Sequence, residues 1–279
     1  ALLMIIIASV YISNLIDQNN RAKTRQINSQ QIESTIDQVD NTIFFINRIL
    51  QSVANNRYIV DAVIRPNPDY TDRNQNVIAY LRSVKRDNNY ISKAYVYEDT
   101  QRTLFSSEGS IVHLNADDIT TIVPLKIIEN MDHDPATVVL NKDHTFRTVL
   151  TVYENEAYLC YQSITATWGG YHSTIIAKLN TNYLFNNVIT KNETLNHGIT
   201  VCVNDTVLYS NLDKRTEINN QTEQIQASSH VTGWSYRTFP HLYEGTRLIF
   251  IIKEILPFLG IAVFFSLTCA LIIAQSFYY

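Results

Sequence analysis

The stretch from residue 255 to residue 274, ILPFLGIAVFFSLTCALIIA, carries no charged side chain. An α-helix needs about 20 mainly apolar residues to cross ~30 Å of hydrocarbon. Buried helices of water-soluble domains rarely stay uncharged over this length, whereas the Leu, Ile, Val and Phe residues here favour membrane insertion by about 5 kcal/mol. We therefore predict a transmembrane helix over 255–274, and we interpret the rest of the chain as attached to a membrane.

A second apolar segment opens the chain. Residues 1–16, ALLMIIIASVYISNLI, are uncharged up to Asp17. They are few for a complete span, but no small-residue cleavage site follows, which argues against a signal peptide. Since the sequence starts at Ala1, we predict a truncated first transmembrane helix over 1–16. Two such spans place the long segment 17–254 on one side of the membrane.

The composition of the chain argues against several kinds of partner and site. The formal net charge is −4 and only 17% of the residues are charged, so no basic surface is available for direct nucleic-acid binding. The three cysteines are far apart, and Cys269 lies inside the predicted span, which leaves no disulfide framework and no CxxC metal pattern. Many tyrosines and few charges are typical of a β-rich globular domain.

An apolar stripe follows the first span at alternating spacings of four and three. Its members are Ile32, Ile36, Val39, Ile43, Ile46, Leu50 and Val53. No Pro or Gly interrupts residues 1–65, so we predict one helix that runs to about Asn55, with 17–58 as a long signalling helix. Two partners for the stripe are open. It packs on the chain's own sheet, which Phe44, Phe45 and Ile49 favour by widening the apolar face, or it pairs in parallel with a second copy, or each holds along a different part of the helix.

The segment 59–180 changes from a helical to a strand period. The run Arg65-Pro66-Asn67-Pro68 breaks the first helix, and a second helix is predicted from Asp69 to about Arg86. A short helical connection, disturbed by Pro124, is expected over 116–130. The predicted strands are 91–97, 102–106, 145–153, 157–164 and 172–179, with 145–153 and 157–164 forming a hairpin.

A smaller copy of this plan follows over 181–240. We predict a helix over 182–189, a hairpin of 199–203 with 206–209, and a last strand over 231–239. The chain then becomes helical over 241–254, as an exit helix that leads into the closing span. The predicted fold class is α+β: a long N-terminal helix, then a membrane-distal and a membrane-proximal antiparallel-sheet module, flanked by two transmembrane helices.

Five segments in this order carry a family resemblance. They are DNTIFFINRILQSVANNRYIVDAV, YLRSVKRDNNYISKAYVYEDTQRTLFSSEG, GYHSTIIAKLNTNYLFNNVI, GITVCVNDTVLYSN and TGWSYRTFP. The chain resembles the extracytoplasmic double-Cache (dCACHE) sensor region of YesM-like histidine kinases of Gram-positive bacteria. The resemblance implies two PAS-like modules outside the cytoplasm over 17–254, a multi-pass protein of the cell membrane, a homodimer, and HAMP and kinase domains after the second span.

Two alternatives to a sensor histidine kinase stay open. Similar ectodomains occur on membrane-anchored AraC-type transcription regulators, in which a helix-turn-helix domain follows the span. A structural ectodomain without any ligand is the second alternative. The residues after Tyr279 would distinguish a histidine kinase from an AraC-type regulator, because HAMP and kinase motifs differ from a helix-turn-helix domain.

The predicted ectodomain, residues 17–254, lacks the common catalytic and cofactor motifs. It contains no GxSxG, HExxH or GxGxxG pattern, and with seven glycines in the chain a phosphate-binding loop is difficult to build. His133 stands between Asp132 and Asp134 and offers a hard-metal site, but a solvated loop before Pro135 explains the same residues. We predict no catalytic residues, no metal and no cofactor.

Ligand binding is the favoured activity. A PAS-like sheet presents a concave face, and a ligand is expected between that face and the segments above it. The family resemblance implies that the membrane-distal module holds the pocket, for a small extracellular solute presented free or by a solute-binding protein. Candidate ligand-binding residues are polar or aromatic: Tyr95, Tyr97, Arg147, Tyr153, Tyr161 and Trp168. Arg147 is the most informative of these, since a guanidinium can hold a carboxylate in a bidentate manner.

Overall fold

The structure is a computed structural model that describes residues 2–64, 71–100, 102–114, 122–143, 145–163, 172–189, 198–204, 206–212, 224–238 and 260–276. Its helices are α1 (Leu2–Ala54), α2 (Arg57–Ile64), α3 (Thr71–Asp87), α4 (Val123–Asn130) and α5 (Thr181–Ile189). Its strands are β1 (Ile91–Glu98), β2 (Thr103–Ser106), β3 (Ile111–His113), β4 (Val138–Lys142), β5 (Phe146–Tyr153), β6 (Glu156–Ser163), β7 (Ser173–Leu179), β8 (Ile199–Val203), β9 (Thr206–Ser210), β10 (Ile225–Ser228) and β11 (Ser235–Thr238).

The chain divides into two compact units, one of residues 1–28 with 240–279 and one of residues 29–239. In the first unit, residues 2–28 belong to α1 and residues 260–276 are helical. No helix within the described residues is both long enough and apolar enough to cross a membrane. The predicted exit helix 241–254 and the first five residues of the predicted span 255–274 lie outside the described part of the chain.

The second unit is α+β, as predicted, with two antiparallel sheets beside the long first helix. Its described residues form a large sheet in the order β3-β2-β1-β7-β6-β5-β4 and a small sheet in the order β10-β11-β8-β9. All neighbouring strands run antiparallel. Strands β3, β4 and β10 were not predicted, because each has at most five residues and none has a fully buried position that would mark an apolar period.

Helix α1 ends at Ala54, one residue before the predicted end, and its apolar stripe is buried inside the second unit. The seven stripe residues are at most 8% exposed and belong to one apolar cluster with residues of both sheets. The stripe therefore packs on the chain's own sheets. The alternative in which these residues pair with a second copy is wrong, because the same side chains cannot fill both contacts.

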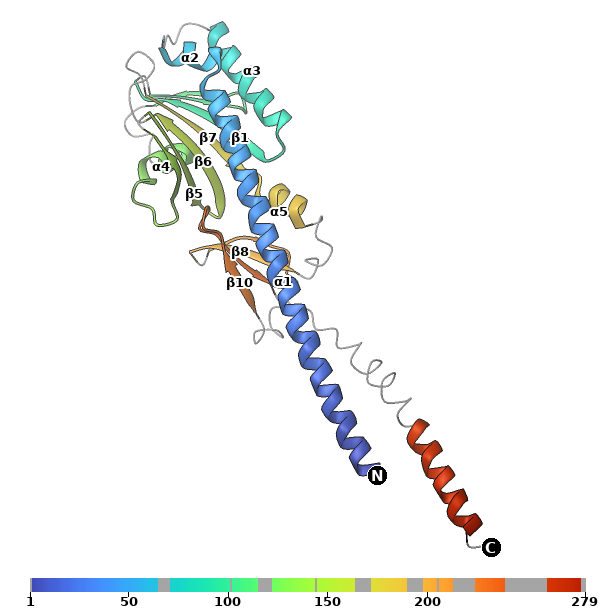
Figure 1. Cartoon of the computed structure of the whole chain (residues 1–279). Helices are drawn as coiled ribbons and strands as arrows, with labels where there is room; N and C mark the ends of the chain where they lie inside the picture. Colours follow the sequence, from blue (N-terminus) through green and yellow to red (C-terminus); the bar gives the residue numbers. More distant parts are fainter. Residues whose placement is uncertain are drawn as a thin grey trace. The chain divides into compact units, whose positions relative to one another are not determined.

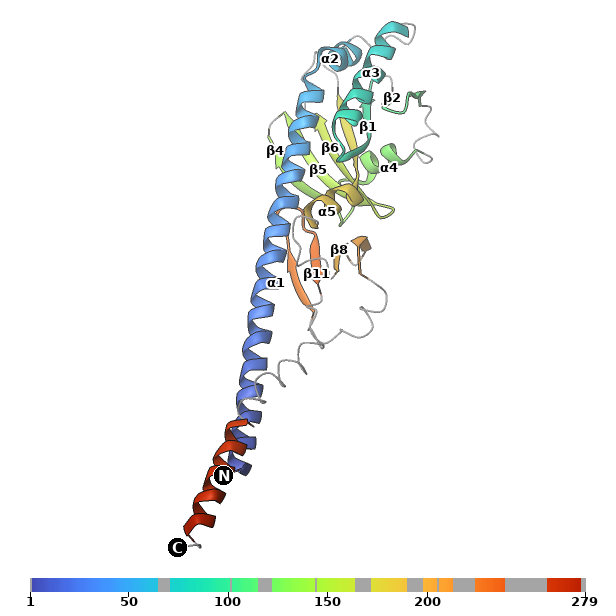
Figure 2. The ribbon, with the colours of Figure 1, turned by 90° about the vertical axis from the view of Figure 1, so that its right-hand side faces the viewer.

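The two faces of the large sheet carry different helices. Figures 1 and 2 show α1 along one side of this sheet and α4 on the other. The apolar cluster of the α1 face includes Val96, Leu159 and Ala177 from the sheet and Leu81 from α3. Two smaller clusters lie on the α4 face, where Ile127 and Leu125 of α4 meet the sheet. Helix α4 begins at Val123 and has Pro124 in its first turn, where the missing N–H of a proline removes no intrahelical hydrogen bond.

Aromatic side chains pack against the small sheet, within the same apolar cluster that holds the α1 stripe. Phe185 of α5 lies 4.9 Å from the Tyr209 ring and 5.9 Å from the Trp234 ring, measured between ring centroids. A buried carboxylate joins this sheet to α1: Ser229, in the turn between β10 and β11, donates to Asp40 at 2.8 and 2.9 Å. Burial raises the pKa of Asp40, and the Ser229 hydrogen bond opposes the rise in part.

Candidate functional site

A row of polar side chains crosses the α4 face of the large sheet at one end. Strand pairing places Tyr97 opposite Thr174, Thr174 opposite Gln162, Gln162 opposite Arg147, and Arg147 opposite Lys142. Residues that are directly opposite in neighbouring strands point to the same face of a sheet. These five residues, which we call the polar row, therefore form one continuous line over β1, β7, β6, β5 and β4.

The turn between β5 and β6 sets the register of this row. Glu154 and Asn155 have φ angles of 51° and 63°, the left-handed geometry of a two-residue hairpin turn that matches strand twist. From this turn the eight residues of each strand pair without interruption, and Arg147 meets Gln162 near the far end. A slip of one residue would move Arg147 to the α1 face.

A cavity of about 430 Å³ opens above the polar row. Its lining residues are Tyr97, Asp99, Ile128, Lys142, Arg147, Gln162, Ser163, His172, Ser173 and Thr174. The volume lies in the usual range for small-molecule sites. All of these residues except Ile128, which lies on α4, come from strand ends or the residues next to them. The cavity therefore combines a polar floor with one apolar side chain from the helix.

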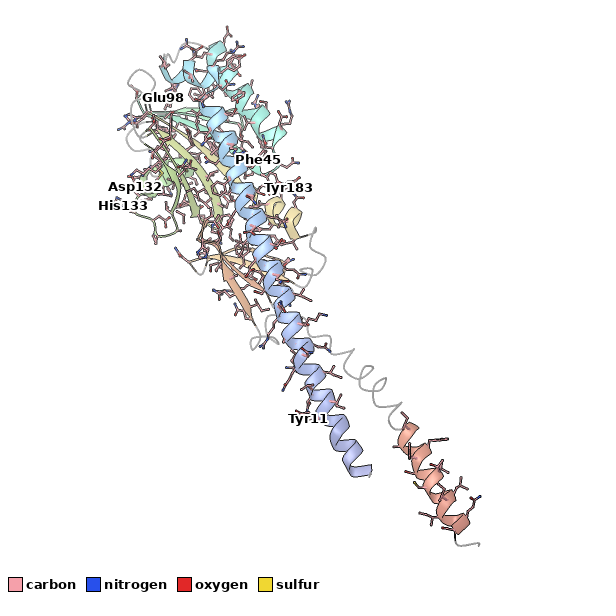
Figure 3. The ribbon with its side chains drawn as sticks, in the orientation of Figure 1. Tyr11, Phe45, Glu98, Asp132, His133 and Tyr183 are labelled. Carbon is pink, nitrogen blue, oxygen red and sulfur yellow. The ribbon has the colours of Figure 1, made fainter. Side chains whose placement is uncertain are left out.

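Arg147 is held on two sides. Its Nε donates to Oε1 of Gln162 at 2.6 Å, while Nη1 and Nη2 contact Oδ1 and Oδ2 of Asp132 at 2.5 and 3.2 Å. Asp132 lies in the turn after α4, and Figure 3 shows it with His133 on the α4 side of the sheet. The hydrogen bond from Arg147 lowers the pKa of Asp132, which stays ionised at neutral pH.

Tyr97 closes the other end of the polar row. Its hydroxyl donates to Oδ1 of Asp99 at 3.3 Å. Burial, followed by the charge of Asp99, raises the pKa of Tyr97 to about 12, so its hydroxyl remains protonated across the physiological range. The cavity thus offers cationic groups at the Arg147 end and a hydroxyl with a carboxylate at the Tyr97 end.

The other predicted ligand-binding residues lie elsewhere. Tyr95 is on the same face as Tyr97 but two residues further along β1, where it contacts both small apolar clusters. Tyr153 is six residues from Arg147 along β5, roughly 20 Å for an extended strand, so one small solute cannot touch both. Tyr161 lies on the α1 face and stacks on Phe146 at 4.9 Å between centroids. Trp168 lies outside the described residues.

Several cavity residues were missed by sequence reasoning. Lys142 is the last residue of β4, a strand that the sequence pattern did not predict. Gln162 and Thr174 are recognised as cavity residues only from the strand register that aligns them with Arg147. The sequence alternatives for the run Asp132 to Asp134 are a hard-metal site and a solvated loop. In the structure Asp132 pairs with Arg147, and Asp134 accepts from the backbone N–H of Ala136 at 2.8 Å.

Comparison with known proteins identifies the fold. No protein-family model matches the sequence, and no curated protein matches it. Two solved structures share the architecture: a domain of a Vibrio parahaemolyticus protein classed in the sensory box/GGDEF family, and the extracellular domain of a protein classed as a histidine kinase, vpHK1S-Z8. The first has a TM-score of 0.50 at 9% identity and covers 78% of this chain and 96% of its own. The second has a TM-score of 0.51 at 11% identity and covers 78% and 94%. The second unit of the chain therefore shares the fold of these two domains.

Proposed function

We propose that this chain is the ligand-sensing and transmembrane signalling region of a bacterial sensor protein, and that a small extracellular solute binds in the cavity above the polar row. The observation that carries the proposal is the polar row, which places five polar or ionisable side chains from five strands under one cavity. The fold shared with an extracellular domain of a protein classed as a histidine kinase supports the same role.

The proposed protein crosses the membrane twice, through residues 1–16 and 255–274, with 17–254 outside the cytoplasm. The absence of charge in both segments supports this topology. Protease treatment of intact cells tests it. Cleavage within 17–254 is expected from the outside, and complete protection of this segment would contradict the proposal.

The proposed signal is a change in packing between the membrane-distal and membrane-proximal modules that reaches the membrane through α1 and the exit helix, and then HAMP and kinase domains. Packed helices have discrete arrangements, so a helix displacement of about 1–2 Å can switch the protein from one arrangement to the other. A ligand drives such a switch only through unequal affinity for the two states, and a hundredfold preference corresponds to about 2.7 kcal/mol.

A homodimer is part of this proposal, and its seam must avoid the buried stripe of α1. Phe44 and Phe45 face outward from α1 and are 41% and 50% exposed. We expect a single cysteine at Phe45 to crosslink two copies in the membrane and one at the buried Ile43 to remain uncrosslinked. Equal yields from both positions would argue against a seam on this side of α1.

A binding screen tests the sensing function. The full 279-residue chain in mild detergent is screened by thermal shift against amino acids, carboxylates, sugars and peptides. A hit should raise the melting temperature, be recovered chemically unchanged, and lose its effect with Arg147→Gln but keep it with Tyr161→Phe. A compound recovered as a product would indicate an enzyme. The absence of any hit would favour a structural ectodomain.

A further inference from the structure

The arrangement around Arg147 suggests a class of ligand and a form of regulation, and both rest on the proposed function. We infer that the cavity takes a small carboxylate, and that Asp132 is an internal competitor that occupies Arg147 until the ligand displaces it. Binding would then exchange one carboxylate for another on the same guanidinium and release the turn that carries Asp132.

The geometry of the guanidinium requires this exchange. An arginine presents two edges that can hold a carboxylate with two hydrogen bonds, the end edge with both Nη atoms and the side edge with Nε and one Nη. Asp132 takes the end edge through both of its oxygens. Gln162 takes Nε on the side edge. A ligand carboxylate therefore gains a bidentate contact with Arg147 only by replacing Asp132 or Gln162.

Of these two partners, Asp132 is the one that can leave. Gln162 belongs to a strand paired on both sides and stays under the cavity whatever Arg147 binds. Asp132 lies in a turn, its side chain is 54% exposed, and water can solvate its carboxylate after release. The Arg147 side chain is only 20% exposed, so its bidentate pair with Asp132 is stronger than a fully exposed ion pair, and a ligand must offset that free energy to displace Asp132.

The surrounding charge favours an incoming anion. Lys142 lies next to Arg147 in the polar row and lines the cavity, and both Lys142 and His133 lie near enough to Asp132 to lower its pKa further. Displacement of Asp132 leaves two cationic side chains, Arg147 and Lys142, facing the cavity. Asp99 lies at the opposite end, next to Tyr97, and does not oppose a carboxylate bound at Arg147.

Release of Asp132 would alter the end of α4. The turn after this helix is closed by the backbone N–H groups of His133 and Asp134, which both donate to the carbonyl of Asn130 at 2.9 Å. Met131 anchors the turn in an apolar cluster of the α4 face, whereas the Arg147 pair is its contact with the polar row. Loss of that pair frees the exposed part of the turn while Met131 keeps α4 on the sheet.

The test compares two substitutions that remove the same charge. Asp132→Asn removes the competitor, and Glu129→Gln removes an exposed carboxylate three residues earlier, on the last turn of α4. Succinate binding to the full chain in detergent is measured by isothermal titration calorimetry. We expect Asp132→Asn to bind succinate at least tenfold more tightly than wild type and Glu129→Gln to stay within about twofold. Arg147→Gln combined with Asp132→Asn should abolish the gain.

Hydrogen exchange on the wild-type protein gives a readout that needs no variant. Saturating succinate should speed exchange at the amides of His133 and Asp134 and slow it on β5 and β6. Equal affinities of Asp132→Asn and Glu129→Gln, or slower exchange at His133 and Asp134, would overturn the competition even though binding persists. If succinate, acetate and citrate bind neither wild type nor Asp132→Asn, the carboxylate class is overturned. An uncharged hit from the screen would still uphold the sensing function.

Discussion

The two faces of the large sheet are built from the same strands and have opposite characters. On the α1 face, Val96, Leu159 and Ala177 join the stripe of α1 in one apolar cluster. On the α4 face, apolar residues form two smaller clusters, and the polar row and its cavity occupy one end of the sheet. Alternation of side chains along each strand allows one sheet to hold a dry core on one side and a binding surface on the other.

The covering helices explain the difference. Helix α1 presents seven apolar residues over more than five turns, and α3 adds Val77, Leu81 and Val84 to the same face. Helix α4 has only eight residues and cannot cover a sheet of this width. The cavity lies where the cover ends, next to Ile128. Stability should therefore depend on the α1 face, and ligand affinity on the α4 face.

The largest effect is expected from Leu50→Ala. Leu50 is fully buried in the α1-face cluster, and truncation of such a leucine costs about 2–5 kcal/mol of unfolding free energy through lost transfer energy and a residual cavity. Denaturant unfolding of the full chain measures this loss. Glu33→Ala on the exposed side of the same helix is the control and should change the unfolding free energy by about 0.5 kcal/mol at most. Equal losses would show that α1 is not packed as described.

A polar contact on the α1 face gives the next effect. Thr148 of β5 donates its hydroxyl to Oδ1 of Asn47 of α1 at 2.9 Å, and both side chains are buried. Thr148→Val leaves the amide oxygen without this donor, which costs about 1–3 kcal/mol. The double variant Thr148→Val with Asn47→Leu should recover part of the loss, because it removes both polar groups. Additive losses would mean that the two side chains do not interact.

Sequence periodicity predicted the elements of the α1 face well. The stripe of α1, the end of the helix near Asn55 and the β5–β6 hairpin all depend on local patterns of apolar residues and turns. The same stripe also fitted a two-stranded coil, and the sequence favoured the chain's own sheet without excluding a second copy. A heptad pattern specifies a narrow apolar side of a helix but not its partner. The burial of the stripe within the second unit identifies the chain's own sheets as the partner.

The candidate site was less accessible to sequence reasoning because it depends on register. Tyr97 and Tyr161 are both tyrosines in strands, but only the pairing of the strands reveals that they lie on opposite faces. Arg147 was identified from its chemistry, whereas its contacts with Gln162 and Asp132 come from residues fifteen positions away in each direction. Short strands such as β4, which supplies Lys142, have too few residues to show a period.

Asp40, which joins α1 to the small sheet, and Asp132, in the turn after α4, respond to pH in opposite directions. Burial raises the pKa of Asp40, so its stabilising contribution is fully present below its unfolded-state pKa and is lost as pH rises through the raised folded value. Arg147 lowers the pKa of Asp132, so that contribution is present above the unfolded-state pKa and is lost as pH falls. Asp40→Asn should therefore flatten the decline in unfolding free energy toward neutral pH, and Asp132→Asn should flatten the decline toward acid. Urea unfolding between pH 3 and pH 8 measures both slopes, and identical pH profiles for wild type and Asp40→Asn would show that Asp40 titrates normally.

The smallest and most specific comparison uses one hydroxyl on each face. Tyr97→Phe removes a group that lines the cavity, and loss of one hydrogen bond to a ligand lowers affinity by roughly two- to tenfold. Tyr161→Phe removes the same atom from the opposite face, where the ring stacks on Phe146, and should leave affinity unchanged. Both are measured by titration with a hit from the thermal-shift screen. If Tyr161→Phe weakens binding as much as Tyr97→Phe does, the ligand does not distinguish the two faces, and the assignment of the cavity to the α4 side fails.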